Sequence, residues 1–367
     1  MKILFFIESL QSGGKERRLV ELLKGLSKYS DLKCDILLNE NKIDYKEVLE
    51  LDANIHCIAK KSKYDLGLFL RIFQIIKKIN PDIIYSWGHL QSVYSVLPKI
   101  LLNKKLINGM VTTAPGKVRK FSKTWTYCKL TFPFSDVIIS NSKAGLISHN
   151  VPVAKRHCIY NGFNFKRLEK IKTKDAMRKE LGISSKYTVG MVGAFAERKD
   201  FDTFAIVANH LLETRYDITF IAVGDGYNLE NVKGKVKEKI KERFIFTGKR
   251  NDVESIVNIF DVAVLLTKQN DNFGEGISNS IMEYMALGKA VIASDNGGNK
   301  EIIINNKTGF LTDNNPKTVI KLISDIIDNE EKKEEMGKKG LKVIKDSFSI
   351  DKMVANHVEL FIETKKD

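Results

Sequence analysis

The sequence predicts an α/β protein built from two doubly wound domains, each a parallel sheet covered by helices on both faces. Three observations predict this class. Short apolar, β-branched runs alternate with helical patterns along the chain. The runs at 189–192, 220–223 and 262–265 are almost continuously apolar, as strands buried on both faces are. A length of 367 residues corresponds to two domains of ordinary size.

The first half of the chain begins with a buried strand. Residues 1–10 are apolar but contain Glu8 and lack a basic leader region, so they do not read as a signal peptide. The predicted elements are strands at 2–7, 34–38, 82–85 and 137–140, with helices at 15–26 and 65–78. Asn141 or Ser142 could cap the helix that follows.

The alternation is interrupted after Ile159 and then starts again. Asn161-Gly162-Phe163-Asn164 and a polar, basic segment up to Lys186 indicate a linker. Strands are predicted at 188–192, 218–223, 244–246, 262–265 and 290–293, each followed by a helix, and 350–364 is a terminal helix. We therefore expect an N-terminal domain at 1–165, a linker at 166–186, a C-terminal domain at 187–348 and a C-terminal helix at 349–367.

Composition excludes several classes of protein. The apolar fraction of 43% excludes a chain that is mainly disordered. Four separated cysteines without a Cys-x-x-Cys pair indicate neither a disulfide framework nor a zinc module, and favour a reducing cytosol. The stretch 82–102 contains Gly88, His89 and Pro98, which argues against a membrane-spanning helix.

Positive charge is concentrated in the middle of the chain. Residues 51–200 contain 27 Lys and Arg against 9 Asp and Glu, whereas residues 201–367 contain 24 against 27. A solvated lysine face explains such a surplus without a function. The functional alternative is attraction to nucleic acid, phospholipid headgroups or a phosphorylated substrate.

The segment 274–288 carries the sharpest motif, because it follows the strand at 262–265 and enters a helix. It reads Gly274-Glu275-Gly276-Ile277-Ser278-Asn279-Ser280-Ile281-Met282-Glu283-Tyr284-Met285-Ala286-Leu287-Gly288. Strand ends of open α/β sheets bind ligands, and a helix N-terminus attracts phosphate. Glu275 and Glu283 lie on different levels, so they can hold different parts of one extended ligand. The alternative is structural: a first-turn acid favoured by the dipole and a solvated Glu283.

This motif resembles the retaining glycosyltransferases of family 4, which have the two-domain GT-B fold. The Glu-x7-Glu spacing of Glu275 and Glu283 carries the resemblance, and further segments agree in the family's order. These are Gly13-Gly14-Lys15-Glu16-Arg17, Ile159-Tyr160-Asn161-Gly162, Val223-Gly224-Asp225-Gly226, residues 246–253, residues 294–301 and Thr308-Gly309-Phe310. The match is dense over 186–312 and sparse before it. It implies two Rossmann-like doubly wound domains facing a cleft, with a C-terminal helix.

The resemblance implies roles for residues of the motif. Glu283 would hold the ribose hydroxyls of a nucleotide, and Glu275 would contact the transferred sugar as a catalytic residue, since carboxylates accept from paired hydroxyls. Backbone N–H groups at Gly276 and Ile277, with Ser278 next to them, would meet the diphosphate of the donor.

Basic residues would complete the binding site for the donor's diphosphate. The family's frequent pattern is Gly-Arg-x4-Lys, and this chain has Gly193-Ala194-Phe195-Ala196-Glu197-Arg198-Lys199. Lys199 matches the lysine, whereas Ala194 stands in place of the arginine, for which Arg198 could compensate. Lys249 and Arg250 are further donor-binding candidates. A solvated loop is the alternative for Arg198 and Lys199.

Three candidates lie in the first half. Gly13 and Gly14 would let the loop after the first strand approach the donor's phosphates, and an ordinary strand-to-helix turn is the alternative. His89 is the candidate for the family's catalytic-site histidine. Trp87 competes with His89 for that position of the family pattern, and a structural histidine is the other explanation of His89.

No metal or other cofactor is expected. The remaining histidines show no ligand spacing. Asp200-Phe201-Asp202 is formally an Asp-x-Asp, but it opens a helix, where capping and the helix dipole favour acids.

The sequence therefore predicts a retaining, metal-independent glycosyltransferase. It would move a hexose-type sugar from a nucleotide sugar, with UDP preferred, to a hydroxyl of a glycan or lipid-linked glycan in cell-surface polysaccharide synthesis. A nucleotide-sugar epimerase of GT-B fold is one alternative, although its additional acid/base residues are not identified. A basic nucleic-acid-binding protein is the other, but no recognition helix, aromatic sheet or zinc pattern supports it, so nucleic acid is not an expected partner.

The expected location is the cytoplasm, with peripheral attachment to the inner face of the cell membrane. Residues 117–134 combine Lys, Arg, Trp and Tyr, the residue types that membrane interfaces select. An anionic membrane surface is therefore an expected partner. The alternative is that Trp125, Phe132 and Phe134 are core residues beneath a solvated lysine face.

Overall fold

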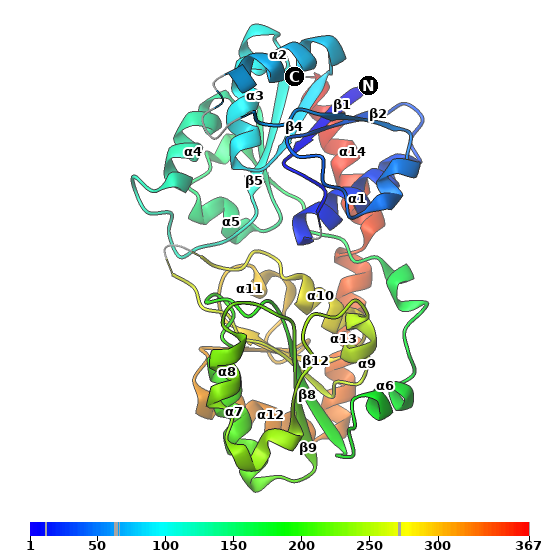
Figure 1. Cartoon of the computed structure of the whole chain (residues 1–367), viewed down its shortest axis with the longest axis vertical. Coiled ribbons are helices and arrows are strands. Elements are labelled where there is room, and N and C mark those ends of the chain that lie inside the picture. Colours follow the sequence, from blue (N-terminus) through cyan, green and yellow to red (C-terminus); the bar gives the residue numbers. More distant parts are fainter. Residues whose placement is uncertain (12, 62–64, 66, 271–272, 367) are drawn as a thin grey trace. The chain divides into compact units, whose positions relative to one another are not determined.

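The computed structural model describes residues 1–11, 13–61, 65, 67–270 and 273–366, and the chain folds into two compact units (Figure 1). Unit 1 contains Met1–Gly162 and Ile350–Asp367, and unit 2 contains Phe163–Ser349. The segment expected as a linker, 166–186, thus lies within unit 2. The helix expected as a separate C-terminal element belongs to unit 1.

Unit 1 contains a seven-stranded parallel sheet in the order β3-β2-β1-β4-β5-β6-β7. Its strands are β1 (Lys2–Ile7), β2 (Lys33–Leu38), β3 (Ala53–Cys57), β4 (Ile83–Trp87), β5 (Lys105–Val111), β6 (Val137–Ser140) and β7 (Arg156–Cys158). Its α-helices are α1 (Gly14–Leu26), α2 (Gly67–Ile79), α3 (His89–Leu101), α4 (Lys123–Thr131), α5 (Lys143–Ser148) and α14 (Ile350–Lys366).

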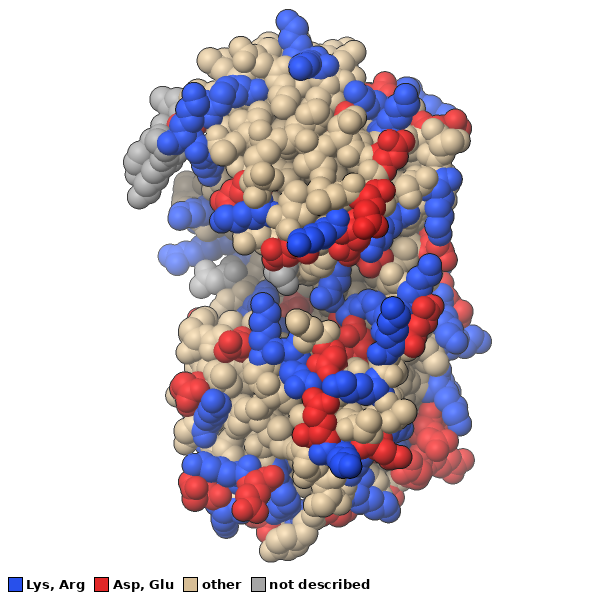
Figure 2. All heavy atoms as spheres, turned by 45° about the vertical axis from the view of Figure 1, so that its right-hand side comes forward, with Lys and Arg blue, Asp and Glu red and all other residues tan. Residues whose placement is uncertain are grey.

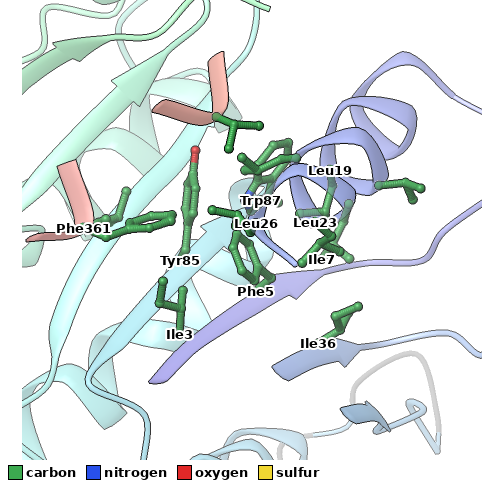
Figure 3. Packing of buried hydrophobic residues seen from close by; sticks show 14 of the residues in the cluster. Ile3, Phe5, Ile7, Leu19, Leu23, Leu26, Ile36, Tyr85, Trp87 and Phe361 are labelled. Atoms are coloured by element: carbon green, nitrogen blue, oxygen red, sulfur yellow. The ribbon is translucent and has the colours of Figure 1, made fainter. Parts of the chain in front are cut away.

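Alternation along β1 sends its side chains to two separate cores. Phe5 is buried with Leu23 of α1 and Phe361 of α14, together with Tyr85 of β4 (Figure 3). Phe6, on the opposite face, belongs to the core built with α2 and α3. Because successive residues of a strand point to opposite faces, a sheet covered on both sides needs an unbroken apolar strand.

Unit 2 contains a six-stranded parallel sheet in the order β10-β9-β8-β11-β12-β13. Its strands are β8 (Tyr187–Val192), β9 (Ile218–Val223), β10 (Phe244–Phe246), β11 (Val262–Leu265), β12 (Ala290–Ser294) and β13 (Phe310–Thr312). Its α-helices are α6 (Lys174–Glu180), α7 (Phe201–Thr214), α8 (Leu229–Lys235), α9 (Val253–Asn258), α10 (Asn279–Ala286), α11 (Asn299–Ile302), α12 (Pro316–Ile327) and α13 (Glu330–Ser347). Helix α7 contacts α12, and α10 contacts α13.

Both sheets have the doubly wound strand order, so the predicted fold class is confirmed. Each sheet starts in its middle, proceeds to one edge, and then returns to add strands on the other side of its first strand. The order therefore reverses between β1 and β4 in unit 1, and between β8 and β11 in unit 2. Ligands of such sheets bind beyond the carboxyl ends of the strands at this switch point.

Charges on the two units are distributed differently. On the face seen in Figure 2, basic and acidic side chains of unit 2 alternate, and many form ion pairs, such as Lys172 with Glu180 and Arg250 with Asp252. In unit 1, residues 83–162 contain one acid, Asp136. No helix within the described part of the chain has the length and apolar character needed to cross a membrane.

Candidate active site

Two side chains of unit 2 meet at the switch point of its sheet. Lys199 follows β8, and Glu275 follows β11. Their side chains form an ion pair, in which Lys199 Nζ lies 2.8 Å from Glu275 Oε1. Lys199 is only 6% exposed, so this ion pair is largely shielded from water. A shielded pair exerts a stronger field on a bound ligand than the same charges would at the surface.

The backbone around Glu275 is held by the chain that follows β12. The N–H group of Gly298 donates to Glu275 O at 3.0 Å. A Cβ atom on Gly298 would lie 2.6 Å from the carbonyl carbon of Gly276, and one on Gly297 would overlap the carbonyl of Glu275. Gly297 also has φ 52°, in the left-handed region. Glycines at both positions thus allow the backbone contact that positions Glu275 and Gly276.

The protonation state of Glu275 follows from its surroundings. Burial by itself would raise the pKa of this carboxyl group, but the ammonium of Lys199 and the guanidinium of Arg198 outweigh burial, so the pKa lies below its ordinary value. Glu275 is therefore a carboxylate at neutral pH. It can accept hydrogen bonds from sugar hydroxyls.

Helix α10 is attached directly to the end of β8. Ser280 Oγ donates to Val192 O at 3.1 Å, and the N–H group of Val192 donates to the hydroxyl of Tyr284 at 2.6 Å. Residues 276–278 precede the helix, with Ser278 at the N-cap position. The first-turn N–H groups of a helix have no acceptor within it and form the positive end of its dipole. The structure thus brings Gly276, Ile277 and Ser278 together with Lys199 and Glu275.

Arg198 and the two acids after Lys199 have different surroundings. Arg198 is exposed, as is Ala194, which stands in place of the expected arginine. Asp200 caps α7 by accepting from the N–H group of Thr203 at 3.2 Å. Asp202 forms an ion pair with Lys235 at 2.7 Å. Helix capping and a surface ion pair therefore account for both acids of the Asp-x-Asp.

Glu283 belongs to a buried group of charges that the sequence did not indicate. Arg167 Nη2 lies 2.7 Å from Glu283 Oε1, and the same guanidinium forms an ion pair with Glu254. The ring of Phe163 lies beneath it, 5.2 Å from the guanidinium carbon. Burial disfavours the charge of Arg167, but Glu283 and Glu254 raise its pKa above the ordinary value. Two carboxylates thus share one cation, and Glu283 is not the solvated helix residue of the structural alternative.

Arg167 and Glu254 were missed because neither lies in the motif. Arg167 lies in the segment that was expected to be a linker, and Glu254 lies in the first turn of α9, remote in sequence. The Asn161-Gly162 turn shortly before Arg167 was the only available signal.

Lys249 and Arg250 lie in the segment between β10 and α9. Lys249 is exposed. Arg250 is bound by Asp252 at 2.8 Å and by Glu180 at 2.6 Å, and both hydrogen bonds raise its pKa. Arg250 is therefore already neutralised by two acids. A donor-binding role for this pair stays a prediction.

Gly13 and Gly14 lie at the switch point of unit 1. Gly13 is the N-cap residue of α1, with extended backbone and no side chain to cap the helix. The hydroxyl of Tyr45 donates to Gly13 O at 3.1 Å and accepts from its N–H group at 3.3 Å. Gly14, the first residue of the helix, is exposed. A phosphate-binding role for Gly13 and Gly14 at this helix N-terminus stays a prediction.

His89 begins α3 and lies close to the same switch point. It is half-buried, and its ring centroid lies 5.3 Å from that of Tyr127. Burial, with smaller contributions from His149 and Lys15, lowers the pKa of His89, which keeps its imidazole neutral at physiological pH. Trp87, its competitor for the family position, is the last residue of β4 and is fully buried against the guanidinium of Arg18, at 4.4 Å.

Metal ligands do not gather anywhere in the described part of the chain. No three His, Cys, Asp or Glu side chains lie close enough to hold one ion there. The donor set at the switch point of unit 2 is one carboxylate already bound by an ammonium, which is a poor site for a divalent cation.

Comparisons with known proteins concern the chain as a whole. Residues 173–343 match the family model described as glycosyl transferases group 1. An uncharacterized glycosyltransferase of Methanocaldococcus jannaschii is 26% identical over 247 residues, which are 64% of this chain and 60% of that protein. The UDP-Gal:alpha-D-GlcNAc-diphosphoundecaprenol alpha-1,3-galactosyltransferase of Escherichia coli is 25% identical over 322 residues, 82% of this chain and 80% of that protein.

Solved structures show the same fold. The Anabaena protein HepE, crystallised with UDP and glucose, superposes with a TM-score of 0.85 at 19% identity, over 99% of each chain. The fold is therefore that of the GT-B glycosyltransferases, as the resemblance implied. The family match and the relatives support a glycosyltransferase.

Proposed function

We propose that this protein is a retaining glycosyltransferase that transfers a hexose from a UDP-sugar to a hydroxyl of a glycan or lipid-linked glycan. The observation that carries the proposal is the buried pair of Lys199 and Glu275 beside the N-terminus of α10, at the switch point of unit 2. This is where a nucleotide sugar needs positive potential for its diphosphate and an acceptor for its sugar hydroxyls.

Unit 2 offers complementary groups for each part of the donor. The N–H groups of Gly276 and Ile277 and the ammonium of Lys199 would stabilise the negative charge that develops on the leaving diphosphate, with Arg198 assisting from the loop. Glu275 would orient the sugar. Glu283, held by Arg167 at 2.7 Å, would accept from the ribose hydroxyls. Because these groups neutralise the diphosphate, we propose that the reaction needs no metal ion.

Unit 1 would bind the acceptor. Gly13 and Gly14 would approach a phosphate, and the neutral imidazole of His89 would contact the sugar. The Escherichia coli relative is named for a UDP-galactose donor and a diphosphoundecaprenol-linked acceptor. Because of this similarity we propose that the acceptor is a lipid-linked glycan and that the reaction belongs to cell-surface polysaccharide synthesis. We also propose that the protein attaches peripherally to the inner face of the membrane.

Calorimetry and turnover test the proposal together. We expect UDP to bind more tightly than ADP or GDP, and one UDP-sugar to be hydrolysed slowly without an acceptor, with the anomeric configuration retained in the first product seen by NMR. EDTA should leave the rate unchanged. A folded protein that binds no nucleoside diphosphate would contradict the proposal, and activity restored only by Mn²⁺ or Mg²⁺ would contradict its metal-free form.

A further inference from the structure

A groove in unit 1, remote in sequence from every candidate site residue, combines an apolar floor with a basic rim. Its volume is about 490 Å³. Val118, Trp125 and Phe132 contribute to the floor, and Pro133 extends it. Helix α4 supplies Trp125, and the segments before and after the helix supply the other three residues. A hydrocarbon chain is the kind of group that such a floor accommodates.

Lysines surround this floor. Lys117, Lys120, Lys129 and Lys155 all line the groove, and no carboxylate does. Lys155 Nζ donates to Pro133 O at 2.8 Å, which fixes one wall of the groove. The other three lysines are exposed.

The charge of the surrounding surface has the same sign. From residue 83 to residue 162 the single acid is Asp136, and Lys99 neutralises it at 2.9 Å. The same stretch contains these basic residues: Lys99, Lys104, Lys105, Lys117, Arg119, Lys120, Lys123, Lys129, Lys143, Lys155 and Arg156. The groove therefore favours an anionic occupant over a cationic one.

Large apolar side chains next to the groove are exposed. Phe121 is 84% exposed, Val153 78%, Leu130 50% and Phe134 42%. Phe121 also has φ 61°, in the left-handed region that bulky side chains rarely adopt. Its ring centroid lies 5.1 Å from that of Trp125. An exposed aromatic residue on strained backbone makes this surface a candidate for binding.

We propose that this groove and its exposed rim bind an anionic phospholipid bilayer. The lysines would hold lipid phosphates, an acyl chain would occupy the floor, and Phe121 and Leu130 would enter the interfacial region. A base could stack on Phe121, but Leu130 and Val153 beside it are exposed aliphatic side chains, which suit hydrocarbon and not bases, so a bilayer fits this surface better than nucleic acid. The inference deepens the proposed function, and rests on it for the lipid-linked acceptor that gives the contact a purpose.

The test uses the full-length protein and two kinds of vesicle, phosphatidylcholine alone and phosphatidylcholine mixed with phosphatidylglycerol. We expect sedimentation with the mixed vesicles, weakened by salt, and little with the neutral ones. The double variant K120E/K129E should bind the mixed vesicles at least about tenfold more weakly. K307E/K317E, which reverses two exposed lysines of unit 2, is the matched control and should bind like the unchanged protein.

Tryptophan fluorescence gives an independent measurement. The chain has two tryptophans, and Trp87 is fully buried in unit 1. A blue shift on adding mixed vesicles should therefore come from Trp125 and disappear in W125F. F121S should reduce the binding that survives at high salt, because that part is apolar.

The outcomes separate this inference from the proposed function, because UDP binding is measured on the same samples. K120E/K129E that binds UDP normally but fails to bind vesicles supports the lipid site. Equal vesicle binding by K120E/K129E and the unchanged protein overturns it, and so does tighter binding to a single-stranded oligonucleotide than to mixed vesicles. Vesicle binding without any UDP binding leaves the lipid site standing and refutes the proposed function.

Discussion

The two glutamates of the candidate site differ in what holds them. Glu275 has a single close cation, Lys199, and lies against a backbone of glycines. Glu283 shares Arg167 with Glu254. A ligand that takes one oxygen of Glu283 would still leave Arg167 bound to Glu254, so the cation stays neutralised. The same spacing motif therefore contains one acid paired with a single lysine and one acid that shares an arginine with a second acid.

Replacing Glu275 by Gln should separate turnover from nucleotide binding. We expect kcat of donor hydrolysis to fall by about a hundredfold or more, while the Kd of UDP changes little, because the proposed partner of Glu275 is the sugar. Steady-state kinetics and calorimetry measure the two effects. Glu197→Gln, at an exposed acid of the same loop region, is the control. Equal losses of turnover and UDP affinity would refute the division of roles.

Glu283→Ala should instead weaken UDP binding itself. The loss of a charge-assisted hydrogen bond to ribose corresponds to about 1–3 kcal/mol. Calorimetry with uridine and with UDP should show similar losses, since both contain the ribose. A folded variant with unchanged affinity would remove Glu283 from the ribose site.

Arg167→Met removes the cation that Glu283 and Glu254 share. Two neighbouring carboxylates would remain partly buried without it, and we expect the unfolding free energy of unit 2 to fall by about 2–4 kcal/mol. The double variant with Glu254→Gln should recover part of this loss, because one carboxylate is then gone. Urea unfolding measures both, and an unchanged midpoint for Arg167→Met would show that the ion pairs are dispensable.

Strands were predictable where their residues form an apolar run, as in β10 at the edge of its sheet. The predicted strands at 2–7, 137–140, 218–223, 244–246 and 262–265 coincide with the observed bounds of β1, β6, β9, β10 and β11. The sequence did not indicate β3, β5, β7 or β13. Three of these are edge strands, which need no apolar run. Strand β5 contains Asn108, which can be buried because its amide donates to Thr131 and Ser135. The hydrophobic periodicity of the sequence does not reveal partners that lie so far along the chain.

The site was predictable to a similar extent. Glu275 and the start of α10 could be proposed because strand ends of open α/β sheets bind ligands, and Lys199 because it matches the lysine of the family pattern. The Arg167 group could not, because it depends on contacts between segments separated by more than a hundred residues. No spacing rule connects them.

The segment after β12 contacts the segment before α10 at Gly298, and a substitution that adds one methyl group there tests this contact. In Gly298→Ala the new Cβ would lie 2.6 Å from the backbone of Gly276, so Glu275 must move. We expect lower turnover and a loss of about 1–3 kcal/mol of stability. Gly234→Ala, in α8 with open space around the position, should be neutral or stabilising by up to about 1 kcal/mol. Full activity in Gly298→Ala would show that this contact does not set the site.

On the scale of the whole molecule, unit 1 is assembled from both ends of the chain. Helix α14 packs against α1 and contributes Phe361 and His357 to the core. His357 Nδ1 donates to Met353 O at 2.7 Å, so its Nε2 accepts from the hydroxyl of Tyr85 at 3.2 Å. The neutral ring thereby connects the returning helix to β4.

Unit 1 should lose stability as the pH falls, because burial lowers the pKa of His357 to about 3. In the unfolded chain the pKa of His357 is about 6.5, so between pH 6.5 and pH 3 the imidazole is protonated in the unfolded chain but not in the folded one. The stability that the neutral His357 gives unit 1 is therefore complete above pH 6.5 and is lost as the pH falls. At pH 5 the unfolding free energy of unit 1 should be about 2 kcal/mol lower than at neutral pH. Urea unfolding followed by fluorescence isolates unit 1, which contains both tryptophans.

Two variants decide whether His357 causes this loss. His357→Gln should flatten the acid limb of the profile, whereas His210→Gln, at an exposed histidine of unit 2, should leave it unchanged. A profile that stays as steep in His357→Gln as in the unchanged protein would assign the acid sensitivity to other groups.

Because α14 completes the core of unit 1, the order of synthesis on the ribosome differs from the order of folding. Residues 1–162 emerge first, but Phe5 and Tyr85 keep an uncovered face until residues 350–366 have been translated. Unit 2, whose residues are contiguous, can fold completely in the meantime. We therefore expect nascent chains that stall within unit 2 to expose apolar surface from unit 1, and to be the species that chaperones bind.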